Sequence, residues 1–428
     1  MSDVPKPTLV TRLRNGLEVR LQEIRTTPLT TCWVWYRVGS RNETPGITGI
    51  SHWVEHMQFK GTPKFPAGVL DRAISRNGGH WNAFTWLDWT AYLEILPADH
   101  VRLALDLEAD RMQNSIFDSK EVEAERTVIL SERRGHENEP TFRLAEEMQA
   151  ASFRVHSYHH EVIGDMVDLK SITRDDLFAH YRNFYVPSNA VLVVAGDFNT
   201  RRMLDQIREV FGPLPKVPPP QQKSRREPPQ GGERIINVGG PGETSYLKVA
   251  YHAPAADEAD FFPITVLGSV LAGASSLNFF AGGISNKTSR LYRALVDGEV
   301  AASVHGGLAA SIDPYLYNLH VTVRSDRTPE QALAVLDQEI ARVLEGPIDE
   351  QELAKAVKQA RALFAYGSES ISNQGFWRGF CEMFSDGSWY ETYLDRLAEV
   401  TPDQVWDAAQ KYFPSSNRVV GFYRPNSS

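Results

Sequence analysis

Residues 49–62 read GISHWVEHMQFKGT, and the pattern His52-x-x-Glu55-His56 lies at the centre of this stretch. Residues four apart share one face of an α-helix, so His52 and His56 can direct their imidazoles at one point. Two imidazoles on one helix face form part of a Zn²⁺ site. Glu55 flanks the same face and need not ligate, because a carboxylate beside the metal can take a proton from the attacking water.

Two imidazoles do not complete a catalytic zinc site, which usually has three protein ligands and one open position. Residues 119–134 read as a charged helix on another element. Glu125 and Glu132 are seven positions apart in it, which is two helical turns, so they share a face. The residues alone leave open which of the two is the third ligand.

Further stretches carry a family resemblance. They are FKGT at 59–62, GGHWNAFT at 78–85, TAY at 90–92 and the run from 185 to 198. Together with the His-x-x-Glu-His pattern, they make most of residues 10–425 resemble the pitrilysin/insulinase-type metallopeptidases. These are the inverzincins, which include the mitochondrial processing peptidase, and the chain looks close to the bacterial processing-peptidase-like members.

The resemblance implies a ligand set and roles for the acidic residues. In the family a distal Glu ligand follows the second His by roughly 75 residues. Glu132 lies 76 residues after His56 (132 minus 56) and fits that role. The implied metal ligands are therefore His52, His56 and Glu132, with one Zn²⁺ per chain. Glu55 is the implied catalytic base, and Glu125 assists catalysis by orienting the ligands or the motif helix, unless it is an ordinary surface residue.

Residues 81–85 and 90–96 read as paired strands. The resemblance implies that the first of them is an edge strand beside the zinc, which receives the substrate peptide by β-strand addition. Asn82, Ala83 and Phe84 are the implied substrate-binding residues. The plain alternative is a hairpin arm without such a role.

Length and composition limit the classes of protein that fit. A chain of 428 residues suits two domains of about 200 residues. Lys and Arg total 45 against 54 Asp and Glu, and a net charge of −9 argues against general binding to nucleic acid or anionic membranes. Cys32 and Cys381 are too few and too far apart for a disulfide framework or a cysteine zinc site.

The N-terminal stretch 1–7 has no apolar signal core, and no run of 18 apolar residues occurs. We therefore expect no membrane span and a cytoplasmic location.

Matching text at a constant offset indicates an internal duplication. Thr173 and Asn189 are matched by Thr401 and Asn417, both 228 residues later (401 minus 173, 417 minus 189). The second copy has no His-x-x-Glu-His, and its equivalent of the motif helix, near 261–271, is apolar.

The predicted fold is α+β, with two homologous domains that each have a mainly antiparallel sheet packed with helices. The predicted divisions are a zinc-binding peptidase domain at 1–212, a Pro-rich linker at 213–234, and an inactive homologous domain at 235–428. Five prolines among residues 213–220 make the first part of the linker extended.

The second half departs from the family pattern. Active single-chain relatives often carry an Arg and a Tyr that bind the substrate carbonyl, but Val296 and Ala302 stand near those places. Tyr315 and Tyr317 are the alternatives. The loop between Gly273 and Gly283 either covers the cleft or contacts a subunit. The missing pair predicts a homodimer or a heterodimer with a similar, metal-free subunit.

The predicted function is that of a zinc-dependent endopeptidase acting on peptide or unfolded polypeptide substrates. The alternative is a non-catalytic structural or assembly subunit related to the respiratory-complex core proteins. A second metal site at His156, His159 and His160 is disfavoured, since family relatives have a His-x-Tyr segment there in a loop.

Overall fold

The protein, a computed structural model, is described for residues 7–222, 224–278 and 283–426. The fold is α+β, as predicted, with one six-stranded and one five-stranded sheet, each packed with helices. The chain forms two compact units. Unit 1 contains residues up to 133, 160–224 and 368–387, and unit 2 contains 134–159, 225–367 and 388 onward.

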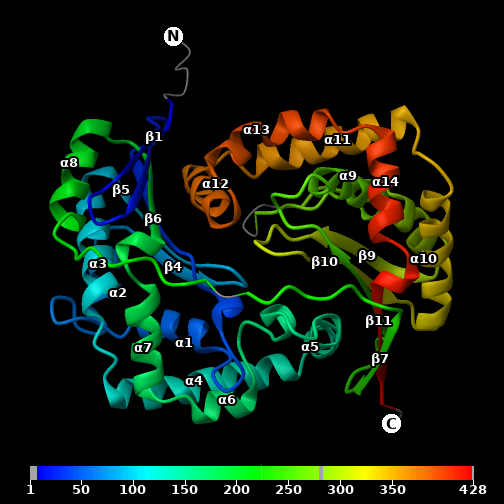
Figure 1. The fold of residues 1–428 in the computed structure, drawn as a ribbon, viewed down its shortest axis with the longest axis horizontal. Coiled ribbons are helices and arrows are strands. Elements are labelled where there is room, and N and C mark those ends of the chain that lie inside the picture. The colour runs from blue at the N-terminus through cyan, green and yellow to red at the C-terminus, as the bar shows by residue number, and fades with distance from the viewer. Residues whose placement is uncertain (1–6, 223, 279–282, 427–428) are drawn as a thin grey trace. The chain divides into compact units, whose positions relative to one another are not determined.

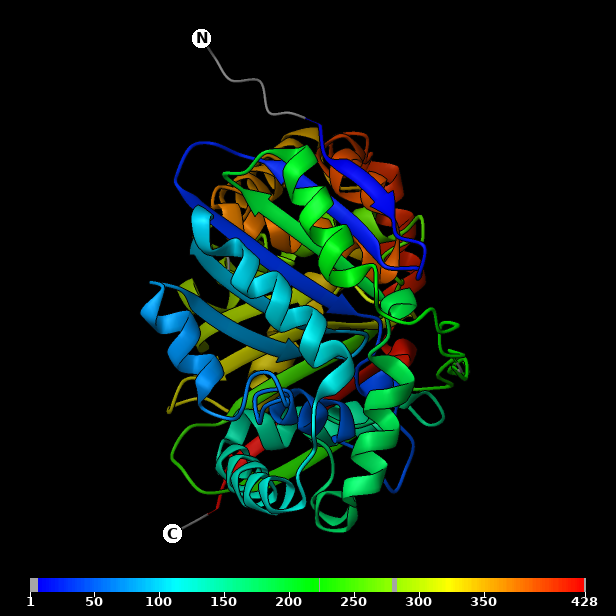
Figure 2. The ribbon, with the colours of Figure 1, turned by 90° about the vertical axis from the view of Figure 1, so that its left-hand side faces the viewer.

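The sheet of unit 1 has the strand order β1-β2-β6-β3-β5-β4. All neighbouring strands are antiparallel except β2 and β6, so the predicted mainly antiparallel sheet is confirmed. Figure 2 shows this sheet face-on behind its helices. The strands are β1 (Leu9–Arg12), β2 (Glu18–Glu23), β3 (Leu29–Tyr36), β4 (His80–Thr85), β5 (Thr90–Pro97) and β6 (Ala190–Gly196).

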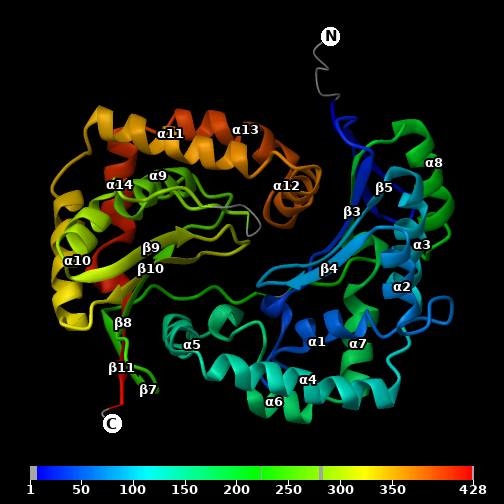
Figure 3. The same ribbon diagram turned by 180° about the vertical axis from the view of Figure 1, so that it is seen from behind.

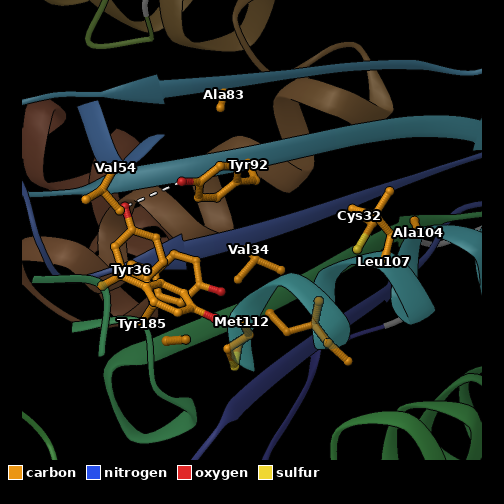
Figure 4. Close-up of a cluster of buried hydrophobic side chains, with 14 of the residues drawn as sticks. Cys32, Val34, Tyr36, Val54, Ala83, Tyr92, Ala104, Leu107, Met112 and Tyr185 are labelled. Carbon is orange, nitrogen blue, oxygen red and sulfur yellow. Dashed lines mark hydrogen bonds between the residues drawn. The ribbon is translucent and has the colours of Figure 1, made fainter. Parts of the chain in front are cut away.

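One face of this sheet carries the main core of unit 1. Alternate strand residues such as Val34, Tyr36 and Tyr92 point into it, because side chains alternate between the faces of a strand. Figure 4 shows these side chains together with Val54 of the motif helix. The helices of unit 1 on this side are α1 (Ile50–Met57), α2 (Val69–Arg76), α3 (Val101–Asn114), α4 (Ser119–Glu137), α6 (Met166–Ser171), α7 (Arg174–Phe184) and α8 (Thr200–Phe211).

The opposite face of this sheet presents Trp33 and Trp35, which are covered by α12 (Ile371–Phe384). Two glycines on α12 make room for the indoles. A Cβ on Gly375 would lie 2.7 Å from Trp33 Cδ1, and a Cβ on Gly379 would lie 2.0 Å from Trp35 Nε1. A segment from the second half of the sequence therefore completes unit 1.

The sheet of unit 2 has the order β7-β11-β8-β10-β9, and only β7 and β11 are parallel. The apolar helix α9 packs on one face with α10 and α14, and α11 packs on α9, while α5 packs on the other face (Figures 1 and 3). These elements are β7 (Arg234–Gly240), β8 (Tyr246–Ala253), β9 (Ala301–Leu308), β10 (Tyr315–Val323), β11 (Arg418–Pro425), α5 (Pro140–Ser152), α9 (Phe261–Ala272), α10 (Pro329–Leu344), α11 (Glu350–Tyr366), α13 (Gly387–Ala398) and α14 (Pro402–Tyr412).

The two units repeat one plan, as the offset of 228 residues predicted. The order β2-β6-β3-β5-β4 corresponds to β7-β11-β8-β10-β9. Thr173 and Thr401 each cap a helix, accepting from the backbone N–H three residues on. Asn189 and Asn417 each donate to the carbonyl five residues before, at 2.9 and 2.7 Å.

Two segments lie with the other sheet from the one that their place in the sequence predicted. Residues 134–159, which include α5, belong to unit 2, and residues 368–387, which include α12, belong to unit 1. Helical periodicity shows which face of a helix is apolar but not which sheet that face meets. The predicted linker, 213–233, contains no helix or strand among its described residues.

Cys32 and Cys381 are buried free thiols, as predicted. Within the described part of the chain, no helix is both long and apolar enough to cross a membrane.

Candidate active site

The motif helix α1 is short and amphipathic. It begins after Gly49, whose φ of 85° suits glycine, and it ends at Met57. Trp53, Val54 and Met57 are buried in the core of unit 1, because they lie on the face that meets the sheet. His52 and His56 lie on the other face and are half-buried.

The structure brings three predicted metal ligands together. His52 Nε2 and His56 Nε2 are 3.2 Å apart, and their rings cross at 70°. His56 Nε2 is 3.9 Å from Oε2 of Glu132, which comes from α4. One ligand atom from each residue lies within 4.8 Å of the other two, and no other His, Cys, Asp or Glu group of this kind occurs among the described residues.

The donor set fits zinc. Two imidazoles and one carboxylate leave a fourth position open, which is the arrangement of a catalytic rather than a structural zinc site. The side chain of Glu132 is 36% exposed, so water and substrate can reach the cluster.

Glu125 lies on the far side of the His56 ring. Its Oε1 accepts a hydrogen bond from His56 Nδ1 at 2.8 Å, and its Oε2 is 2.5 Å from the ammonium of Lys60. Burial alone would raise the pKa of Glu125, but these two partners outweigh it and the pKa is lowered. Burial lowers the pKa of His56, but Glu125 and the nearby carboxylates raise it above its usual value. The carboxylate is thus held charged against the ligand ring.

Glu55 is buried on the motif helix and held by a threonine. Thr85 Oγ1 donates to Glu55 Oε2 at 2.6 Å. Thr85 Oγ1 is 3.3 Å from Thr90 Oγ1, which donates to the carbonyl of Val38 at 2.9 Å. Burial raises the pKa of Glu55 to about 7, against the lowering effect of the Thr85 hydrogen bond. A pKa near neutral pH suits a group that accepts and returns a proton.

The predicted substrate-binding residues lie on β4, the last strand in the order of the unit 1 sheet. Asn82 is exposed, Phe84 is half-buried and Ala83 is 8% exposed. The backbone N–H of Ala83 donates to Asn82 Oδ1 at 2.9 Å. A polar hollow of about 440 Å³ adjoins this strand; it is lined by Phe59, Lys60, Ala67, Gly68, Leu70, Asp71, Trp81, Asn82 and Glu121.

Comparison with protein families assigns both halves of the chain. Residues 18–166 match the family described as Insulinase (Peptidase family M16). Residues 171–360 match the family described as Peptidase M16 inactive domain. The chain belongs to the insulinase-type M16 peptidase family. The resemblance predicted from the motifs is thereby confirmed.

Individual relatives of this M16 chain agree with the assignment. It is 28% identical to the zinc protease PqqE of Helicobacter pylori, over 99% of this chain and 94% of that protein. It is 26% identical to the mitochondrial-processing peptidase subunit beta of Blastocladiella emersonii, over 84% of this chain and 76% of that protein. The solved structure of a protease from Helicobacter pylori has a TM-score of 0.91 and 25% identity, covering 99% of this chain and 100% of that one.

The structure places the proposed carbonyl-binding alternatives inside unit 2. Tyr317 is 1% exposed and packs on Phe413 in the core of that unit. Tyr315 is 8% exposed and stacks on Phe153. Part of the loop between Gly273 and Gly283, residues 279–282, lies outside the described residues.

The histidines at 156–160 serve two separate contacts within the M16 fold. His156 Nε2 is 3.0 Å from Asp313 in unit 2, and His160 Nε2 is 2.9 Å from Glu43 in unit 1. The second metal site that the sequence analysis disfavoured is not among the metal-competent groups of the described residues.

Sequence reasoning missed the partners that hold the site residues. Thr85 and Lys60 lie within the stretches that carried the resemblance, but no role was predicted for either. Their signal was position: Thr85 ends the edge strand, and Lys60 lies four residues after His56, one helical turn further on.

Proposed function

We propose that this M16 chain is a zinc-dependent endopeptidase that acts on peptides or unfolded polypeptides. The observation that carries the proposal is the convergence of His52, His56 and Glu132 within 4.8 Å, together with a buried Glu55 on the same helix. The zinc proteases among the relatives support the choice of metal and reaction.

His52, His56 and Glu132 would hold one zinc ion per chain. When bound, zinc supplies a Lewis acid that polarises the scissile carbonyl and makes water more acidic. Glu125 keeps a proton on His56 Nδ1, so that Nε2 presents its lone pair to the site.

Glu55 acts as the general base. Thr85 donates to Oε2, which leaves Oε1 of Glu55 to take the proton from the attacking water and to pass it to the leaving amine. General acid–base help of this kind contributes on the order of 10²- to 10⁴-fold in rate.

The substrate would bind as an added strand along β4. In this mode backbone hydrogen bonds provide much of the affinity, so the peptide must be extended but its sequence can vary. Asn82, Ala83 and Phe84 form the receiving segment. The N–H of Ala83 would exchange the side chain of Asn82 for a substrate carbonyl.

A second subunit belongs to the proposal. Val296 and Ala302 stand where active single-chain relatives often carry an Arg and a Tyr. The relative from Blastocladiella emersonii is named as a subunit of a processing peptidase, which supports association with a similar, metal-free chain. A homodimer is the second arrangement. The same substitutions favour, as the alternative function, a non-catalytic assembly subunit.

Peptide hydrolysis by the purified chain tests the proposal. Metal-free protein receives one equivalent of zinc and is incubated with an unstructured peptide, alone and with any chain that co-purifies. We expect cleavage that needs zinc, stops with a chelator and returns when zinc is added back. A zinc-loaded chain that cleaves nothing in either form would support the assembly role instead.

A further inference from the structure

The first turn of α1 is held by a side chain from outside the helix. Gly49, the residue before the helix, has no side chain with which to cap it. Instead, Glu43 accepts hydrogen bonds from the backbone N–H of Gly49 and of Ser51, each at 2.8 Å. The first N–H groups of a helix have no partners within it, and so short a helix is marginal on its own. Glu43 therefore determines where α1 begins.

Glu43 is itself fixed by His160. His160 Nε2 donates to Glu43 Oε2 at 2.9 Å, and the two side chains are only 3% and 0% exposed. Burial lowers the pKa of His160, but the hydrogen bond and charge of Glu43 outweigh it, so the pKa lies above its usual value. A hydrogen bond between charged partners is shorter and stronger than a neutral one. The anchor is thus a locked, buried pair.

A third contact defines the rotation of the same turn. Ser51 Oγ donates to the carbonyl of Gly39 at 3.1 Å and lies 3.2 Å from Nε2 of His180. Burial lowers the pKa of His180 to about 3, so its ring is neutral and Nε2–H donates to Ser51. Ser51 directly precedes His52, so the turn that carries this ligand is held on two sides.

We propose that Glu43, locked by His160, is a positioning residue for the metal centre. It sets the rotation and the axial position of α1, and thereby the place of the His52 and His56 imidazoles relative to Glu132 on α4. The inference rests on the proposed function and names the residue that controls the geometry of its metal site. If α1 turned, both imidazoles would move while Glu132 stayed, and the three donors would no longer meet.

The test measures metal binding rather than activity. Glu43→Gln, His160→Gln and His160→Leu are compared with wild type and with Glu209→Gln, a surface control on α8. Zn²⁺ affinity is measured by competition with a chromophoric chelator, the ligand field by the visible spectrum of the Co²⁺-substituted protein, and stability by urea unfolding of the metal-free protein.

We expect Glu43→Gln to weaken Zn²⁺ binding roughly 10- to 100-fold, as found when partners that orient ligands are lost, and to change the Co²⁺ spectrum. His160→Gln keeps a donor and should retain most of the affinity, whereas His160→Leu should not. The Glu209→Gln control should match wild type. A merely structural anchor would lower the free energy of unfolding and leave affinity and spectrum unchanged in the folded variants.

Wild-type affinity and spectrum in folded Glu43→Gln would overturn the inference. If Glu43→Gln does not fold, wild-type values in His160→Leu would overturn it equally. Zinc binding without peptide cleavage in the wild type would remove the proposed function alone, because the affinity shift would still support the anchor. Failure of the wild type to bind zinc would overturn both.

Discussion

His56 Nδ1 donates a hydrogen bond to Oε1 of Glu125 at 2.8 Å, from the side of the ring opposite to His52 and Glu132. A carboxylate in this place fixes the tautomer and orientation of a ligating imidazole and makes it a better donor to metal. Lys60 holds the other oxygen of Glu125, so this carboxylate is itself immobilised. The candidate site therefore consists of ligands together with residues that orient them.

Removing both imidazoles should abolish the metal site. We expect the double variant His52→Ala, His56→Ala to lose the one zinc per chain found in wild type, since one carboxylate cannot hold the ion. Glu132→Gln should retain a weakened site. Elemental analysis of purified protein checks this, and stoichiometric zinc in the double variant would refute the ligand assignment.

Glu125→Gln should weaken the site without removing a ligand. The amide cannot accept from His56 and pair with Lys60 as a carboxylate does, and we expect zinc affinity to fall roughly 10- to 100-fold. Chelator competition measures the change, with Glu123→Gln on the exposed face of the same helix as control. Equal affinity in Glu125→Gln and its control would leave Glu125 as an ordinary helix residue.

The docking of α12 on the tryptophans should be sensitive to a single methyl group. In Gly379→Ala the new Cβ would lie 2.0 Å from Trp35 Nε1, and such overpacking typically costs about 1–3 kcal/mol of unfolding free energy. A Cβ on Gly135, in α4, would have nothing within 4 Å, and Gly135→Ala should stabilise by about 0.5–1 kcal/mol. Urea denaturation compares them, and an unchanged midpoint for Gly379→Ala would contradict the close contact.

Acid should destabilise unit 1 through His180. Its pKa is about 3 in the folded protein because of burial, below the ordinary 6.5. Between these values the unfolded chain binds the extra proton. The stabilisation is therefore complete above pH 6.5 and is lost as the pH falls, by at most about 1.4 kcal/mol per pH unit.

His180→Gln should flatten the dependence of unfolding midpoint on pH between about 4.5 and 6.5. Burial also lowers the pKa of His320 to about 3, so the difference between wild type and variant, in metal-free protein, is the relevant quantity. Parallel pH curves for the two proteins would show that His180 does not stay neutral.

The sequence predicted those features that depend on spacing. Helical period placed His52 and His56 together, and the common offset of Thr173 and Thr401 predicted a second, similar sheet, which the structure confirms. The sequence did not predict that 134–159 and 368–387 join the other unit, because the partner of an apolar face depends on three-dimensional fit. Gly375 and Gly379, one helical turn apart, were the visible sign of a close helix contact.

The anchor of α1 was invisible for a similar reason. Glu43 and His160 are 117 positions apart, and neither belongs to a periodic pattern that would pair them. Glu55 was recognisable as the base from its place in the motif, but its hydrogen bond from Thr85 depends on β4 lying beside α1.

The most direct measurement compares wild type and Glu55→Gln at equal, verified zinc content in the hydrolysis of one unstructured peptide. The amide keeps the size and shape of the carboxylate but cannot accept the proton. We predict unchanged zinc binding and a rate that falls by roughly 10² or more. Hydrolysis by zinc-loaded Glu55→Gln at the wild-type rate would contradict the account, because the chain would then cleave peptides without the base that its motif helix provides.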